Sequence, residues 1–211
     1  TCAICLETVQ GEGGIYPATK DFLAGIRQLC DEHEILMISD EIQCGMGRSG
    51  EMFAYQTYGV TPDIVVSAKA LGCGVPVGAI GTRGRATGVL SAGDHGTTYG
   101  SNPLATAAVA AVFQLFEQYD VLANVREMTA YLDHVLSDLA VRSKLIQKIR
   151  GLGLMKGIEL SVPAASYIKA LQESGVIVIP SGTHVIRLLP PLILRKEHID
   201  EFAFSFAKTL K

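Results

Sequence analysis

Short continuous apolar runs that end in charged residues constrain this chain more than any other feature. Residues 35–39 (Ile-Leu-Met-Ile-Ser) lead into Asp40, and residues 63–67 (Asp-Ile-Val-Val-Ser) are followed closely by Lys69. Runs of this length without polar alternation are typical of strands buried on both faces of a parallel sheet. We expect a third such strand at 77–81. Because segments with helical spacing separate the runs, the pattern predicts an α/β fold with a largely parallel sheet.

Apolar residues at helical spacing follow the first strand. Phe22, Ile26 and Leu29 share one face and predict a helix that starts at Pro17. Further helices are predicted from 103 toward 119, over 121–139 and 164–174, and from 196 onward, and short strands at 2–6, 151–160, 176–179 and 185–188. The later elements are short and mixed, so we expect two domains: a largely α/β part, 1–117, and a small α+β part, 118–211.

Composition excludes several classes of protein. The 211 residues are 48% apolar and carry a formal net charge of −3, which allows a sizeable core and gives no electrostatic case for binding nucleic acid. The longest strongly apolar stretch, 105–113, is too short to cross a membrane. The five cysteines show no pairing pattern, which fits a reducing cytosol, and the five histidines show no metal-ligand spacing, so we expect no metal site.

Asp40 and Lys69 are the candidate chemical groups, because ligands of open α/β sheets bind at the carboxyl ends of strands. A lysine directly after a buried strand loses hydration, which favours the neutral, nucleophilic amine. A carboxylate on the neighbouring strand end can keep a pyridinium nitrogen protonated, and pyridoxal-phosphate chemistry requires this pairing. Spacing alone favours a plainer interpretation, in which both are solvated or ion-paired residues where strands end.

Five ordered motifs extend the evidence over the whole chain. They are LETVQGEGG (6–14), DEIQCGMGRSG (40–50), TPDI with AKALG (61–64 and 68–72), HGTTYGSNPL (95–104) and VIRLLPPL (185–192). With them the chain resembles the class III pyridoxal-phosphate-dependent aminotransferases. The resemblance implies the type I fold of these transferases. Residues 1–117 would then be the C-terminal part of the large cofactor-binding domain, and residues 118–211 the small C-terminal domain.

The resemblance also implies pyridoxal 5'-phosphate as cofactor, with a role for each matching residue. Lys69 corresponds to the lysine that binds the cofactor covalently and carries a proton during catalysis. Asp40 corresponds to the partner of the pyridine nitrogen, and Gln43 to the donor to the phenolic oxygen of the ring. Thr98 corresponds to the threonine that reaches the cofactor phosphate of the neighbouring subunit, which implies a homodimer with a shared active site.

Three further residues correspond to substrate contacts. Arg187 matches the arginine that receives an α-carboxylate, for which a guanidinium fork is well suited. Glu12 matches the glutamate that masks this arginine while the other substrate reacts; the alternative is a salt bridge between domains without gating. Thr97 stands at a substrate-side position where the family usually has Ser.

The implied reaction moves the ω-amino group of N-acetylornithine to 2-oxoglutarate, a step of arginine biosynthesis in the cytoplasm. Ornithine or 4-aminobutyrate is the alternative amine donor. A different possibility is a truncated, non-catalytic subunit that only dimerises. The chain opens at Thr1 in an apolar run, so we expect it to be a fragment. The family's phosphate loop, stacked aromatic residue and second substrate arginine would precede Thr1, so we expect the isolated fragment to be inactive.

The sequence departs from the family pattern at three positions near these motifs. Thr8 stands where the family usually has Pro, Cys44 replaces a common Thr, and Cys73 interrupts a glycine run after the lysine. None of these changes removes a group to which a chemical role is assigned.

Overall fold

The computed structural model describes residues 1–210 and separates them into two compact units. The first unit comprises residues 1–8, 18–47 and 51–120, and the second comprises 9–17, 48–50 and the chain from 121 onward. The sequence pattern does not reveal that the segments 9–17 and 48–50 leave the first unit. The reason is that they join the second unit by contacts with residues distant in the sequence.

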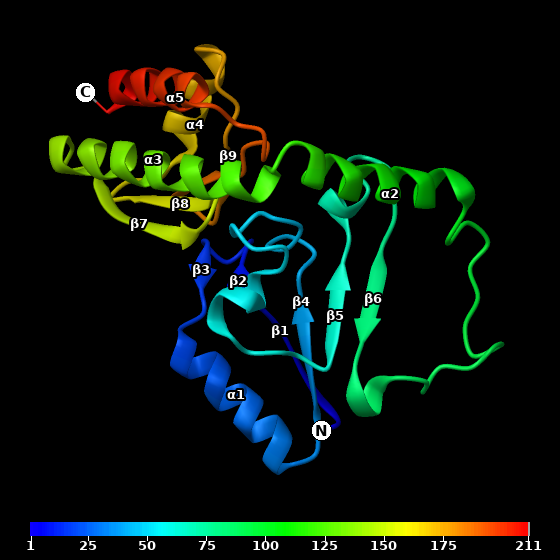
Figure 1. Cartoon of the computed structure of the whole chain (residues 1–211). Helices are drawn as coiled ribbons and strands as arrows, with labels where there is room; N and C mark the ends of the chain where they lie inside the picture. Colours follow the sequence, from blue (N-terminus) through cyan, green and yellow to red (C-terminus); the bar gives the residue numbers. More distant parts are fainter. Residues whose placement is uncertain (211) are drawn as a thin grey trace. The chain divides into compact units, whose positions relative to one another are not determined.

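The first unit contains a four-stranded sheet in the order β1 (Ala3–Glu7), β4 (Leu36–Asp40), β5 (Ile64–Ser67) and β6 (Ala79–Thr82) (Figure 1). β1 with β4 and β4 with β5 pair in parallel, whereas β5 and β6 pair antiparallel. The prediction of a third buried strand is therefore wrong. All four residues of β6 are exposed, because β6 is an edge strand of this sheet.

Two α-helices belong to the first unit. α1 (Lys20–Glu32) begins later than predicted, because the side chain of Thr19 caps it by accepting from the Phe22 N–H at 3.2 Å. Pro17 lies instead in the short strand β3 (Tyr16–Pro17). α2 (Pro103–Gln118) is capped in the same way by Asn102, at the position that the sequence predicts. Three short 3-10 helices complete the unit: η1 (Ala54–Tyr58), η2 (Lys69–Leu71) and η3 (Gly84–Ala86).

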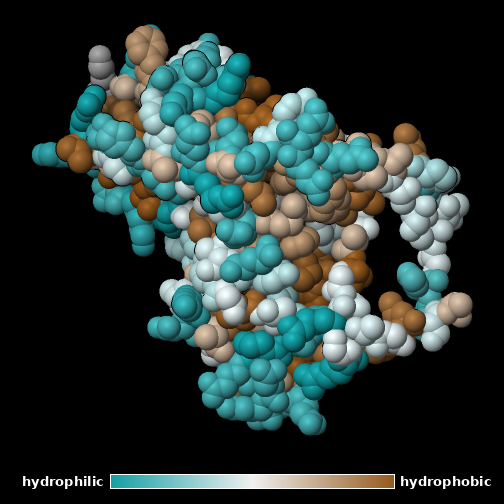
Figure 2. Space-filling view, in the orientation of Figure 1, coloured by the Kyte–Doolittle hydropathy of each residue, from teal (hydrophilic) through white to brown (hydrophobic). Residues whose placement is uncertain are grey.

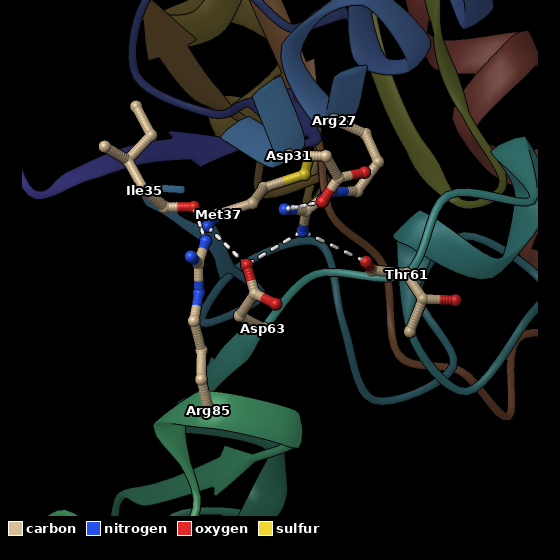
Figure 3. Close-up of polar contacts among 7 residues, drawn as sticks. All are labelled: Arg27, Asp31, Ile35, Met37, Thr61, Asp63 and Arg85. Atoms are coloured by element: carbon tan, nitrogen blue, oxygen red, sulfur yellow. Dashed lines mark hydrogen bonds and ion pairs between the residues drawn. The ribbon is translucent and has the colours of Figure 1, made fainter. Parts of the chain in front are cut away.

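A polar cluster fastens the amino ends of the parallel strands (Figure 3). Asp63, just before β5, accepts from the Met37 N–H at 2.8 Å and from Arg27 of α1 at 2.9 Å. Arg85 of η3 donates to the Ile35 carbonyl. Burial by itself raises the pKa of Asp63, but the hydrogen bonds from Met37 and Arg27 and the charges of Arg27 and Arg85 outweigh it, so its pKa lies below the usual value. Asp40 and Lys69 lie at the other, carboxyl ends of these strands.

The second unit contains an antiparallel sheet in the order β7 (Ile146–Leu152), β8 (Met155–Leu160), β10 (Val185–Leu188) and β9 (Ile179–Ser181). Its helices are α3 (Val121–Arg142), α4 (Ala165–Glu173) and α5 (Lys196–Thr209). The segment predicted as one strand at 151–160 instead contains the end of β7, a turn and β8, because Gly153 with φ of +57° permits a tight turn there. The strand predicted at 176–179 begins only at Ile179.

Two segments from the first part of the sequence complete the second unit. One is the pair β2 (Val9–Gln10) and β3. The other is 48–50, where Arg48 donates to the carbonyls of Leu154 and Pro190, and Arg126 donates to the Gly50 carbonyl at 2.9 Å. Burial lowers the pKa of Arg48 to about 10, so its guanidinium stays charged at neutral pH. No helix within residues 1–210 has the length and apolarity needed to cross a membrane.

Candidate active site

Asp40 and Lys69 lie at the carboxyl ends of two adjacent parallel strands. Asp40 is the last residue of β4 and stands opposite Val66 of β5 in the register. Lys69 follows the end of β5 and begins η2 with φ of +46°, a conformation uncommon for residues other than glycine. The topology thus brings the carboxylate and the amine to one edge of the sheet, as ligand sites of open α/β sheets require.

The expectation that Lys69 is desolvated is wrong for the residues that the structure describes. Lys69 is exposed, because it lies beyond the last paired residue of β5, on a turn at the surface of this unit. Asp40 is half-buried, and its carboxylate is oriented by the Ile42 N–H, which donates to Oδ1 at 3.0 Å. The orientation of Asp40 therefore comes from the loop that follows it.

Glu41, next to Asp40, is a fully buried carboxylate that the sequence analysis does not single out. It accepts from two backbone N–H groups and three side chains: Ala54 at 2.8 Å, Tyr55 at 3.0 Å, Ser39 at 3.1 Å, Thr8 at 3.3 Å and Cys44 at 3.5 Å. Two of the three departures from the family pattern, Thr8 and Cys44, thus place their hydroxyl and thiol on this carboxylate. The signal in the sequence is a second acidic residue inside the 40–50 motif.

The loop from Glu41 to Gly47 is wrapped closely around this carboxylate. The Gly45 N–H donates to the Glu41 carbonyl at 3.0 Å, and a Cβ at Gly45 would lie 2.6 Å from that oxygen. Only glycine fits there, since real Cβ atoms do not approach so near. Gln43 is half-buried within this turn. The fold therefore positions Asp40 and Gln43 through one compact loop whose centre is Glu41.

Thr97 and Thr98 lie elsewhere in the first unit. Both are exposed and belong to the segment 87–102 that connects η3 and α2 without regular secondary structure. Thr97 Oγ1 accepts from the Gly100 N–H at 3.1 Å. Figure 1 shows this connection beyond β6, on the side away from β4, so the described residues do not bring either threonine to Asp40.

Arg187 and Glu12 form an ion pair within the second unit. Arg187 Nη1 of β10 donates to Glu12 Oε1 at 2.6 Å and to the Gly11 carbonyl at 3.3 Å. The Arg187 side chain is 9% exposed and that of Glu12 is 77% exposed. The alternative of a salt bridge between domains is wrong in that form, because both residues belong to the same unit.

A cavity of about 620 Å³ also lies in the first unit. Residues of β5, β6 and α2 line it, among them Val65, Ile80 and Phe113, whereas Asp40 and Lys69 do not. Its walls are mainly apolar, and among residues 1–210 no group of three or more His, Cys, Asp or Glu is placed to hold a metal ion. The two candidate residues Asp40 and Lys69 therefore lie outside this cavity, whose polar lining includes Asp63 and Arg83.

Comparisons of the sequence and of the structure with known proteins all identify aminotransferases. The sequence model of the family described as "Aminotransferase class-III" matches residues 1–210. An acetylornithine aminotransferase of Methanocaldococcus jannaschii is 48% identical over 200 residues, which are 95% of this chain and 50% of that protein. A succinylornithine transaminase of Salmonella typhimurium is 45% identical over 213 residues, 97% of this chain and 52% of that protein.

Among solved structures, the ornithine delta-aminotransferase of Plasmodium falciparum superimposes with a TM-score of 0.92 at 33% identity, over 99% of this chain and 56% of that one. The chain thus spans about half the length of the curated relatives it matches. The fold expected from the motifs is confirmed by these neighbours. The match over residues 1–210, together with the identity to full-length relatives, shows that this chain belongs to the class-III aminotransferase family.

Proposed function

We propose that the protein containing this chain is a cytoplasmic, pyridoxal-phosphate-dependent transaminase of arginine biosynthesis. It moves the ω-amino group of N-acetylornithine to 2-oxoglutarate. The observation that carries the proposal is the placement of Asp40 and Lys69 at adjacent parallel strand ends in a chain of this family. The relative from M. jannaschii, named acetylornithine aminotransferase, supports this choice of donor.

The residues at the sheet edge fit pyridoxal phosphate chemically. The chemistry that the cofactor would supply is an electron sink next to the reacting carbon of the substrate. Asp40, oriented by the Ile42 N–H, would keep the pyridine nitrogen protonated. Lys69 would hold the cofactor covalently through Nζ and, once released, would move a proton as general base and acid. Gln43 would donate to the phenolic oxygen from the loop around Glu41.

The substrate carboxylate is received by Arg187. Its guanidinium is nearly buried and already donates to one carboxylate, that of Glu12, at 2.6 Å. A substrate α-carboxylate replaces Glu12 in one half-reaction, and Glu12 returns to neutralise the arginine in the other. Thr97 contributes a hydroxyl on the substrate side.

Thr98 serves the cofactor phosphate of a second subunit, so the functional protein is a homodimer. Its exposed position, in a segment outside the sheet of its own unit, supports this role. Size-exclusion chromatography with light scattering of the full-length protein tests the proposed dimer.

The test of the enzyme class is covalent labelling of the full-length protein. Borohydride reduction with added pyridoxal phosphate, followed by peptide mapping, labels Lys69 if the proposal holds. Lys69→Ala abolishes the label, whereas Lys144→Ala, which changes another exposed lysine, keeps it. A folded full-length protein with no label on Lys69 would instead be a non-catalytic subunit.

The second candidate is a transaminase of the same class with a different donor. The structural similarity to an ornithine aminotransferase favours ornithine, and the relative from S. typhimurium favours succinylornithine. Turnover of N-acetylornithine, succinylornithine, ornithine and 4-aminobutyrate by the full-length protein decides among them. N-acetylornithine is expected to give the highest kcat/KM, and a higher value for another donor would reassign the substrate.

A further inference from the structure

We propose that the turn at residues 11–15 is a fixed platform, and that only the side chain of Glu12 moves when Arg187 exchanges its partner. In this proposal Arg150 and Ser181 are positioning residues that hold the platform. The proposal rests on the proposed function for the meaning of the exchange, but the fixation of the turn follows from contacts in the second unit alone. Each of the four strands of that unit's sheet supplies one of these contacts.

The first half of the turn is held by β9 and β10. The buried hydroxyl of Ser181 lies 3.0 Å from the Gly11 carbonyl and 2.9 Å from the Glu12 carbonyl. Arg187 adds its own bond to the Gly11 carbonyl at 3.3 Å. Both contacts engage backbone oxygens, so they do not depend on where the Glu12 carboxylate points.

The second half of the turn is held by β7. Arg150, with a side chain only 7% exposed, donates from Nε to the Gly14 carbonyl at 2.6 Å. Its guanidinium carbon lies 4.1 Å from the centre of the Tyr16 ring, and Nη1 pairs with Glu159. One side chain thus binds the backbone of the turn, the first residue of β3 and the neighbouring strand β8. A lysine could supply the charge but not this planar set of donors.

β8 contributes to this fixation through Gly157, whose lack of a side chain lets the turn pack closely against the strand. A Cβ at Gly157 would lie 3.0 Å from the Ile15 Cβ and 3.2 Å from the Gly14 carbonyl. Ile15 is fully buried with φ of +59°, a strained conformation for a β-branched residue. Such a conformation persists only where the surroundings determine it. The backbone of the turn is therefore held in one arrangement.

The ion pair itself is asymmetric. Arg187 is nearly buried, whereas 77% of the Glu12 side chain is exposed. Departure of the Glu12 carboxylate removes the 2.6 Å ion pair of a nearly buried cation, which is costly unless another carboxylate takes its place. The bond from Arg187 to the Gly11 carbonyl keeps the guanidinium oriented meanwhile. A rotation of one exposed side chain is thus sufficient for the exchange, and the turn need not move.

Hydrogen–deuterium exchange of the full-length protein tests the platform directly. The peptide covering 9–17 is expected to exchange slowly. Arg150→Lys and Ser181→Ala are expected to accelerate its exchange by about tenfold, since each removes a buried hydrogen bond. Glu12→Gln and the exposed control Arg142→Lys are expected to leave the rate unchanged. Acceleration by Glu12→Gln would overturn the proposal, because the carboxylate would then be holding the turn.

Ligand binding adds a second readout. Saturation with glutarate, an unreactive dicarboxylate, is expected to displace Glu12 from Arg187 without faster exchange in 9–17. Exchange that rises with glutarate would show that the turn moves as a whole and would contradict the fixed platform. This readout requires no turnover.

Half-reactions measured in single turnovers separate positioning from general destabilisation. Glu12→Gln is expected to lower the ratio of amine-donor to glutamate kcat/KM by about tenfold, the scale of one lost charged hydrogen bond. Arg150→Lys is expected to lower the same ratio in the same direction, and Arg142→Lys not at all. If Arg150→Lys lowered kcat/KM equally in both half-reactions, Arg150 would have only a structural role. Absence of any half-reaction in the wild type would refute the proposed function, while hydrogen exchange would still decide the platform.

Discussion

At the scale of single residues, the neighbouring carboxylates Asp40 and Glu41 divide two tasks. Asp40 is half-buried at the end of β4, with one hydrogen bond from the Ile42 N–H. Glu41 is fully buried and accepts from Thr8, just after β1, from Ser39 of β4 and from the backbone of η1. The Ile42 N–H thus orients the half-buried carboxylate of Asp40, while the carboxylate of Glu41 holds neighbouring segments of the unit together.

We predict that Glu41→Gln destabilises the full-length protein by about 2–4 kcal/mol, because the amide accepts at one oxygen only and leaves buried donors unpaired. Chemical denaturation at neutral pH measures the loss. Glu201→Gln, a change of an exposed carboxylate on α5, is the matched control and is expected to change the stability by less than about 0.5 kcal/mol. Equal stability of the two variants would contradict the role given to Glu41.

The elements that carry the candidate residues were predictable from local pattern, whereas the chemical roles of these residues stay predictions. The apolar runs reveal β4, which ends at Asp40, and β5, which precedes Lys69, and α2 starts at Pro103 after its cap Asn102, as the sequence predicts. Glu41 was missed because its donors come from positions 8, 39, 44, 54 and 55, and a linear pattern does not show that they converge. The exposure of Lys69 was missed because an apolar strand says nothing about the turn that follows it.

At the scale of elements, the errors arise where tertiary contacts override local pattern. β6 reads as a buried strand from its apolar residues, but its position at the sheet edge leaves it exposed. The apolar pattern of 151–160 predicts one strand, but a turn at Gly153, which has positive φ, separates the end of β7 from the antiparallel β8. The segments 9–17 and 48–50 join the second unit through hydrogen bonds of Arg150, Arg48 and Arg126 to carbonyl groups distant in the sequence.

The cluster around Asp63 joins α1, β4, β5 and η3, so its titration is a property of their packing (Figure 3). The pKa of Asp63 is lowered in the folded state, so its contribution is present above the ordinary pKa of an aspartate and is lost as pH falls through the folded value. We predict that Asp63→Asn costs about 1–3 kcal/mol at pH 7 and progressively less below about pH 4. Denaturation measured from pH 7 to pH 2 checks this.

The control Asp21→Asn changes an exposed carboxylate on the same helix as Arg27 and is expected to cost less at pH 7 than Asp63→Asn does. A cost of Asp63→Asn that stays constant down to pH 2 would mean that the carboxylate is not preferentially charged in the folded state.

At the scale of the whole molecule, the first unit exposes several large apolar side chains. Exposed apolar residues occur on β6, in the connection to α2 and on α2 itself: Ile80, Val89, Leu90, Leu104, Phe113 and Leu115. Figure 2 shows apolar atoms at the surface around this sheet and along the connection. Only Ala105 and Val112 of α2 are buried, although the helix is apolar around most of its circumference. A helix of that kind is normally enclosed by protein.

We therefore predict that residues 1–211 expressed alone self-associate, whereas the full-length protein gives one defined oligomer. Light scattering after size-exclusion chromatography distinguishes the two. Apolar patches larger than a few hundred Å² are rare on monomers, so an apolar dye is expected to fluoresce more strongly per mole with the isolated chain than with the full-length protein.

The double variant Leu104→Lys with Leu115→Lys reduces the association if α2 causes it, since both side chains are exposed and neither supports the core of the unit. A monodisperse isolated chain with little dye binding would show that this surface is tolerated in water, and the covering of α2 in the complete protein would then need another explanation than apolar burial.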